Sequence, residues 1–266
     1  MQISRRLGKY TAVTRVAVTN RLAYWPELAA RAGFFALILF IFSQLWGKLL
    51  GSHGSLLGFD RVQLVWYLTI TEVLTLSRTS LVREVTQDVK SGQIAYLLLR
   101  PSQYVLYQFA NYLGEIVVAL LLNFLVGSAV ATLLVGLPPL TPDGAAQALL
   151  LTGIALCLQF LVLIGIALLS FFVEESAPFQ WIYSKMLFTL GGLFIPIDIY
   201  PEFFRKLAAA LPFRSLAYGP ARVFVAPDRQ LFAELAGRGL IWIGLLALLV
   251  AWEYGKGVKR VNVNGG

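Results

Sequence analysis

Charged residues are scarce in this chain of 266 residues: Asp, Glu, Lys and Arg make up 14% of it, whereas hydrophobic residues make up 58%. One soluble core of this length could not bury so much apolar surface, so the composition indicates an integral membrane protein. Histidine and cysteine are scarcer still, with one residue of each, His53 and Cys157. These counts exclude a multi-histidine metal site and an intrachain disulfide.

Two catalytic motifs are also missing. The phosphate-binding pattern G-x-x-x-x-G-K-[ST] does not occur, because Gly47-Lys48 and Gly255-Lys256 lack its leading glycine and its hydroxyl. A serine hydrolase would need a base beside its serine, and the one histidine lies in a loop after the first apolar run. We therefore predict that the chain is not itself an enzyme and binds no cofactor, neither ATP nor magnesium.

Basic residues outnumber acidic ones, 22 to 14, for a formal net charge of +8. The cations gather at the ends of apolar runs and do not follow one face. This distribution is typical of topology signals and contacts with lipid headgroups, and it argues against a nucleic-acid partner.

Five apolar runs are long enough to cross a hydrocarbon core of about 30 Å as helices, and a sixth is interrupted by polar residues. Their length, without alternation of apolar and polar residues, favours helices over barrel strands. The interrupted run, second in order, should face protein or water along one side. We predict an all-α membrane fold with six transmembrane helices, at about residues 32–50, 62–82, 113–135, 146–173, 179–195 and 235–252.

We divide the chain into an N-terminal segment (1–31), a six-helix transmembrane domain (32–254) and a cytoplasmic tail (255–266). Within the domain, a coupling loop (83–106) and an outer segment (196–234) lie between spans. Residues 1–31 are basic and moderately apolar, which predicts an interfacial helix, with a solvated tail as the alternative. Five prolines in 196–234 predict short outer re-entrant helices. Most Lys and Arg residues fall inside if both termini are cytoplasmic, which also places the polar segment 83–106 in the cytoplasm.

Glu72, Arg78, Glu115 and Lys185 are charged residues inside predicted spans. A charge near the bilayer centre costs on the order of 3 kcal/mol, so such groups usually pair or meet water. Glu115 and Lys185 could instead reach the cytoplasmic surface. Pairing of Glu72 or Glu115 with Arg78 or Lys185 across helices is our structural hypothesis, and a role in proton movement is a third reading.

Two stretches resemble a known family. Asp88-Val89-Lys90-Ser91-Gly92-Gln93-Ile94-Ala95-Tyr96-Leu97-Leu98-Leu99-Arg100-Pro101 resembles the cytoplasmic loop after the second span in permeases of the type 2 ATP-binding-cassette (ABC) exporter family, where it forms a short coupling helix. Gly192-Leu193-Phe194-Ile195-Pro196, followed by Tyr200-Pro201 and Leu211-Pro212, is similar to the family's outer re-entrant segment. With the six spans, the resemblance covers nearly the whole chain.

The resemblance implies a half-transporter. Two permeases, identical or different, would pair in the cytoplasmic (inner) membrane, and a separate ABC ATPase would bind ATP and magnesium beneath them. It assigns coupling to the ATPase to Glu84, Asp88, Gly92, Ile94, Arg100 and Pro101, and the outer motif to Gly192, Pro196, Pro201 and Pro212. The implied function is export of an amphiphilic substrate that is lipid-linked, peptide or drug-like. One alternative is an anchoring subunit that recruits an ATPase. Another is a secondary transporter, which is disfavoured because this chain shows no evident internal repeat.

Overall fold

The computed structural model describes residues 2–23, 25–51, 55–56, 58–99, 103–138 and 140–264. The longer helices in these ranges are α1 (Gln2–Ala23), α2 (Trp25–Leu50), α3 (Arg61–Leu76), α6 (Tyr104–Val135), α7 (Pro142–Leu168), α8 (Ala177–Leu190) and α11 (Arg229–Asn264). The shorter elements are helices α4 (Leu81–Lys90), α5 (Ile94–Leu98), α9 (Glu202–Ala210) and α10 (Gly219–Val225), with the helical turns η1 (Leu169–Phe171), η2 (Ile197–Ile199) and η3 (Arg214–Tyr218). The all-α prediction is confirmed for this part of the chain.

Four stretches of helix are long and apolar enough to cross a membrane: Gly33–Leu50, Tyr104–Val135, Pro142–Phe171 and Arg229–Arg260. They overlap the predicted first, third, fourth and sixth spans. The predicted second and fifth spans fall on α3 and α8, which have 16 and 14 residues. The chain is therefore a membrane-embedded helical protein, and the count of six spans stays a prediction.

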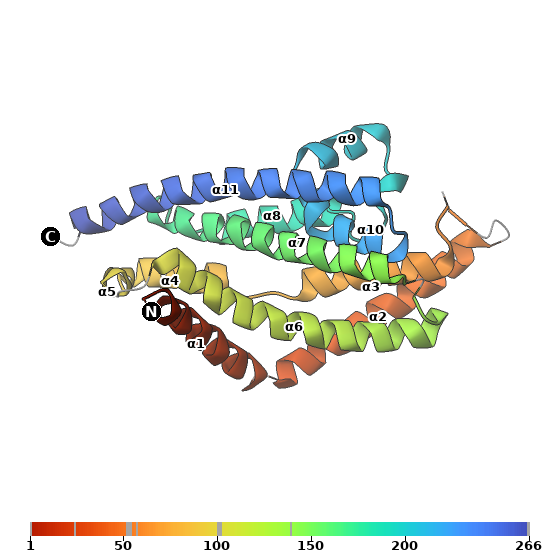
Figure 1. The fold of residues 1–266 in the computed structure, drawn as a ribbon, viewed down its shortest axis with the longest axis horizontal. Helices are drawn as coiled ribbons and strands as arrows, with labels where there is room; N and C mark the ends of the chain where they lie inside the picture. Colours follow the sequence, from red (N-terminus) through yellow and green to blue (C-terminus); the bar gives the residue numbers. More distant parts are fainter. Residues whose placement is uncertain are drawn as a thin grey trace.

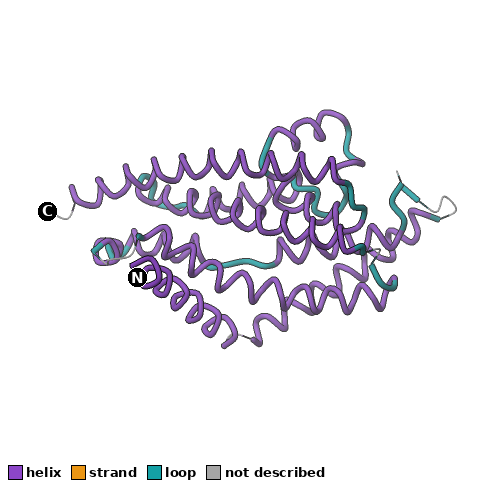
Figure 2. The backbone as a smooth tube through the Cα atoms, viewed as in Figure 1, coloured by secondary structure: helices purple, strands orange, loops and turns teal. Residues whose placement is uncertain are grey.

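Several helix bounds differ from the predicted ones. The second span does not continue to residue 82, because α3 ends at Leu76 and residues 77–80 are not helical (Figure 2). The fifth does not reach residue 195, because α8 ends at Leu190, before two glycines. At the chain ends, the N-terminal helix stops at Ala23 and the last helix runs on through the predicted tail.

Two side-chain hydrogen bonds, one local and one from α6, account for the break after α3. The Ser77 hydroxyl donates to the carbonyl of Val73 at 2.6 Å, and the Asn123 amide of α6 donates to the same hydroxyl at 3.0 Å. Side chains that bond to nearby backbone compete with the helical ladder. The polar run Ser77-Arg78-Thr79-Ser80 therefore leaves the helix where α6 supplies a partner.

The helices lie roughly along one long axis, with α7 beside α11 and α1 beside α6 (Figure 1). Both chain ends and the pair α4–α5 lie at the same end of the molecule, and the connection between α2 and α3 lies at the other. This grouping agrees with the predicted topology, in which the termini and residues 83–106 share one side. Helix α3 runs through the core, where its residues 64–74 are all buried.

Candidate functional site

Helix α4 opens the segment that resembles a coupling loop. It is amphipathic: Leu81, Val82, Val85 and Thr86 are buried, and the helix packs against α7. Arg83 and its neighbours on the opposite face point away from that core. A helix with one buried face is held in place by packing, so its outer face can receive a partner without unfolding.

The turn after α4 depends on a glycine. Gly92 adopts a φ of 72°, the left-handed region that side chains other than glycine seldom adopt. The turn ends α4 and starts α5, where Ile94 is 1% exposed and anchors the short helix. On the other side of α5, Tyr96 and Leu99 are 76% and 83% exposed. Apolar side chains this exposed at a membrane protein's polar end mark a contact surface.

A cleft of about 490 Å³ lies between α4–α5 and the start of α6. Glu84 and Asp88 line it, together with Gln93, Leu97 and Gln108. The structure thus brings two of the predicted coupling carboxylates into one cleft. Of the other predicted coupling residues, Gly92 and Ile94 form the adjacent turn, whereas Arg100 and Pro101 lie outside the described residues.

Hydrogen bonds hold the carboxylates of the cleft. The Tyr104 hydroxyl donates to Asp88 Oδ2 at 2.9 Å and accepts from the Gln108 amide at 3.0 Å. The Asn111 amide donates to Glu84 Oε2 at 3.3 Å, and the Ser80 hydroxyl also donates to Glu84. Both carboxylates are therefore tied to α6 or to the start of α4.

Glu115 joins the same network from α6. It accepts hydrogen bonds from the Ser80 backbone N–H at 3.0 Å, from the Ser80 hydroxyl and from the Asn111 amide at 3.3 Å. The Arg21 guanidinium of α1 donates to the carbonyl of Arg78 at 3.3 Å. The break between α3 and α4 thus has its backbone groups bound by α1 and α6.

A second set of contacts ties α4 to the start of α8. The hydroxyls of Thr86 and Ser176 are 2.6 Å apart and buried, and Ser176 is the residue that precedes α8. Lys90 Nζ lies 2.6 Å from Glu175 Oε2. This hydrogen bond lowers the pKa of the Glu175 carboxyl from its ordinary value. A displacement of α4 would therefore be passed to α8.

A partly open cavity of about 290 Å³ lies between the helices. Its walls come from α2, α3, the break 77–80, α7 and α8. Glu72 and Arg78, two of the four predicted intramembrane charges, both line it. Phe34, Phe188 and Phe194 supply apolar lining. The cavity therefore has a charged part at Glu72 and Arg78 and an apolar part at the three phenylalanines.

Within the described part of the chain, no salt bridge joins Glu72, Arg78, Glu115 or Lys185 to an opposite charge. Glu115 bonds to neutral donors, because the break brings the Ser80 N–H next to it. Lys185 is exposed and lies over the Trp181 ring, with Nζ 5.4 Å from the ring centre. Glu72 and Arg78 attract each other without forming a salt bridge, so the pairing of these two charges stays a hypothesis.

The outer motif packs on α3. Gly192 adopts a φ of 67°, and a Cβ placed there would lie 2.6 Å from Ile197 Cγ1. The Tyr67 hydroxyl donates to the carbonyl of Gly192, and the Thr71 hydroxyl donates to that of Leu193 at 2.7 Å. The polar face of α3 is thus used to bind the backbone of this motif.

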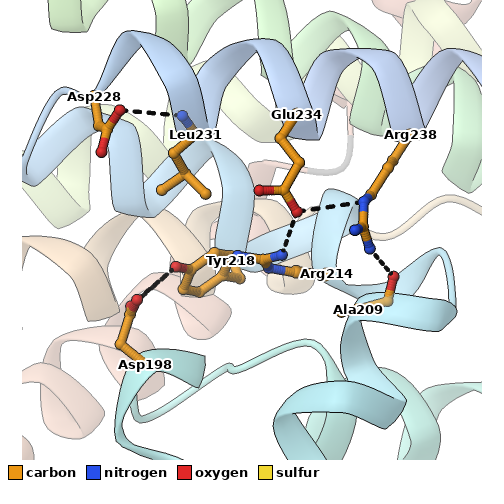
Figure 3. Close-up of polar contacts among 8 residues, drawn as sticks. All are labelled: Asp198, Ala209, Arg214, Tyr218, Asp228, Leu231, Glu234 and Arg238. Atoms are coloured by element: carbon orange, nitrogen blue, oxygen red, sulfur yellow. Dashed lines mark hydrogen bonds and ion pairs between the residues drawn. The ribbon is translucent and has the colours of Figure 1, made fainter.

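The prolines of the outer motif separate short elements. Pro196 precedes η2, Pro201 precedes α9, and Pro212 precedes η3 with its carbonyl accepting from the Ser215 N–H. Ion pairs and hydrogen bonds then connect these elements to one another and to α11 (Figure 3). Those contacts join Tyr218 to Asp198 at 2.9 Å, Arg214 to Glu234 at 3.0 Å, Arg238 to Glu234 at 3.3 Å, and Arg238 to the carbonyl of Ala209 at 2.7 Å.

A family model described as ABC-2 family transporter protein matches residues 32–265. The chain belongs to that family. The resemblance found in the sequence is thereby confirmed, and this ABC-2 permease is a membrane component of an ABC transporter. A comparison with curated proteins gives no significant match.

Sequence reasoning missed several residues that stand out in the structure of this ABC-2 permease. Tyr96 and Leu99 were not predicted as contact residues, because a five-residue helix is too short to show an apolar period. Thr86 and Ser176 are 90 positions apart, and nothing local in the sequence links them. The polar run of residues 77–80 inside a predicted span was the one signal that could have located the break.

Proposed function

We propose that this chain is the permease subunit of an ATP-driven exporter that moves an amphiphilic substrate outward across the cytoplasmic membrane. A separate ATPase subunit binds ATP and magnesium, and a second permease, identical or different, completes the transporter. In this proposal the ATPase docks on α5 and on the cleft beside it. The cavity walled by α3, the break and α8 receives the substrate.

One observation carries the proposal: α4 is attached to two walls of the cavity. At its start, α4 continues directly into the break, where Arg78 and Thr79 line the cavity. Further along, Thr86 is hydrogen-bonded to Ser176, from which α8 runs along the cavity. Closure of an ATPase pair can open or close a membrane path only through an element that moves such walls together.

The exposed surface of α5 supports docking of another protein. Tyr96 and Leu99 stand beside a cleft that contains Glu84 and Asp88, so an apolar contact and polar contacts lie next to each other. Interfaces between proteins combine an apolar centre with a polar rim in the same way. An ATPase docked here would touch α4 and α5 and leave the cavity free.

Docking is tested by co-purification from the organism's own membranes. We expect the tagged chain to bring down an ATPase, detected by its activity and by mass spectrometry. The double variant Tyr96→Asp, Leu99→Asp should lose it, because two carboxylates would be buried in the contact. The matched control is Leu137→Asp, at a leucine that is 78% exposed on the loop after α6. An ATPase that stays bound to the double variant would contradict docking on α5.

The alternatives predict other outcomes. A secondary transporter would bring down no ATPase, even as the unchanged chain. An anchoring subunit would bind the ATPase, but amphiphiles would not change the ATP hydrolysis of the bound partner.

In an exporter, amphiphiles should stimulate ATP hydrolysis. The variant Thr86→Val should weaken that stimulation and leave docking intact, because it removes the hydrogen bond between α4 and Ser176.

A further inference from the structure

The cavity contains buried polar groups that lack a partner. The Tyr183 hydroxyl is buried and has no hydrogen-bond partner among the described residues, and neither has the hydroxyl of Thr79. Buried polar groups in native proteins are nearly always paired, because an unpaired one costs about 1–3 kcal/mol. Glu72, which is 3% exposed, lines the same cavity and forms no salt bridge with a described residue. Two unpartnered hydroxyls and a buried carboxylate that face one cavity indicate a ligand that would satisfy them.

The charges of the cavity select the kind of ligand. Glu72 and Arg78 both line it, and they attract each other without forming a salt bridge. A headgroup with only a negative charge would be repelled by the Glu72 carboxylate. A headgroup with only a positive charge would be repelled by the Arg78 guanidinium. A headgroup with both charges satisfies both side chains at once.

The remaining lining fits the rest of such a molecule. Gln159 and Gln180 can donate to or accept from a polar linker. Phe188 and Phe194 stack edge to face with ring centres 4.8 Å apart and offer an apolar wall. A volume of about 290 Å³ holds a headgroup and leaves an alkyl chain to follow the apolar wall outward.

We propose that the cavity binds the headgroup of a zwitterionic amphiphile. The Glu72 carboxylate accepts hydrogen bonds from its ammonium group, and the Arg78 guanidinium donates to its anionic group. The Tyr183 hydroxyl donates to the same headgroup. This inference rests on the proposed function, in which the cavity is the substrate site, and it names the substrate class.

The test measures binding to the purified full-length chain in an uncharged detergent by native mass spectrometry. Three probes carry the same single alkyl chain: a phosphoethanolamine lipid, a primary alkylammonium and an alkyl phosphate. We expect the phosphoethanolamine to bind about tenfold more tightly than either probe that carries charge of one sign, the ratio that a difference of about 1.4 kcal/mol produces. Glu72→Gln should abolish its advantage over the alkyl phosphate, and Arg78→Gln its advantage over the alkylammonium.

Glu174→Gln is the matched control, because Glu174 is exposed and outside the cavity lining. If Glu72→Gln does not fold, Tyr183→Phe removes one hydroxyl and should still weaken phosphoethanolamine binding several-fold. Equal affinity for all three probes, or binding unchanged by these substitutions, would overturn the inference. The assay needs no ATPase: probe binding without ATPase co-purification would defeat the proposed function alone, and the reverse result would defeat this inference alone.

Discussion

The segment formed by α4 and α5 and the outer segment of residues 196–234 are both short helices joined by turns, yet they are held in opposite ways. In the outer segment, guanidinium groups pair with carboxylates, as Arg214 does with Glu234 (Figure 3). In the α4–α5 segment, carboxylates mostly accept from neutral groups, as Glu84 does from Asn111. Both kinds of bond contain an ionised group and are charge-assisted, but only those of the outer segment join opposite charges. The outer segment is therefore held mainly by ion pairs, and the α4–α5 segment mainly by neutral donors.

Two of the left-handed glycines, Gly92 after α4 and Gly192 just before the outer segment, show the same contrast. Around Gly92, a Cβ would meet no described atom within 4 Å. Around Gly192, it would lie 2.6 Å from Ile197 Cγ1 and 3.0 Å from the Tyr67 hydroxyl oxygen. One glycine is required by its backbone alone, and the other by its backbone and its neighbours.

The largest expected effect is on Gly192. Gly192→Ala should lower the free energy of unfolding by about 2–5 kcal/mol, because it adds left-handed strain and overpacking. Gly92→Ala should cost only about 1–2 kcal/mol, from the strain alone. Thermal or denaturant unfolding of the purified variants in detergent measures both.

Gly237→Ala is the control for these two glycines. Gly237 lies within α11, and a Cβ there would meet no described atom within 4 Å. Alanine should be neutral or stabilising by up to about 1 kcal/mol at such a position. Equal losses for Gly92→Ala and Gly192→Ala would show that the outer segment is no more tightly packed than the turn after α4.

A smaller effect is expected at the ion pairs of the outer segment. Glu234→Gln leaves the guanidiniums of Arg214 and Arg238 with a neutral acceptor and should cost about 1–3 kcal/mol, since the Arg214 side chain is only 16% exposed. Glu202→Gln is the control: its pair with Lys206 is mostly exposed, so the change should stay within about 0.5 kcal/mol. Equal losses in the unfolding assay would mean that the buried network adds no rigidity.

Much of this contrast could be predicted from sequence, because it depends on local signals. Long apolar runs located four spans, and a glycine among polar residues located the turn at Gly92. Five prolines between 196 and 234 fixed the short elements of the outer segment. Hydropathy, glycine and proline each act through the few residues around them.

The rest depended on contacts between distant residues. The end of α3 is set by an amide 46 positions away, that of Asn123, and the partner of Glu115 is a backbone N–H exposed only by that break. We expected opposite charges to pair within the membrane, but neutral donors took that place for Glu115. Composition shows that a buried charge needs a partner, and only the fold shows which group is near enough.

The smallest expected effect concerns the ion pair of the α4–α5 segment. Lys90 and Glu175 side chains are 41% and 53% exposed, and exposed pairs add little stability. The hydrogen bond from Lys90 lowers the Glu175 pKa, so its small contribution is present above the ordinary glutamate pKa and is lost as the pH falls through the lowered value. Glu175→Gln should therefore leave the thermal midpoint of unfolding nearly unchanged at neutral pH. In acid or high salt, the difference in midpoint between the variant and the unchanged protein should be smaller still. A large loss at neutral pH would mean that the α4–α5 segment is held by ion pairs like the outer one, and the contrast between them would fail.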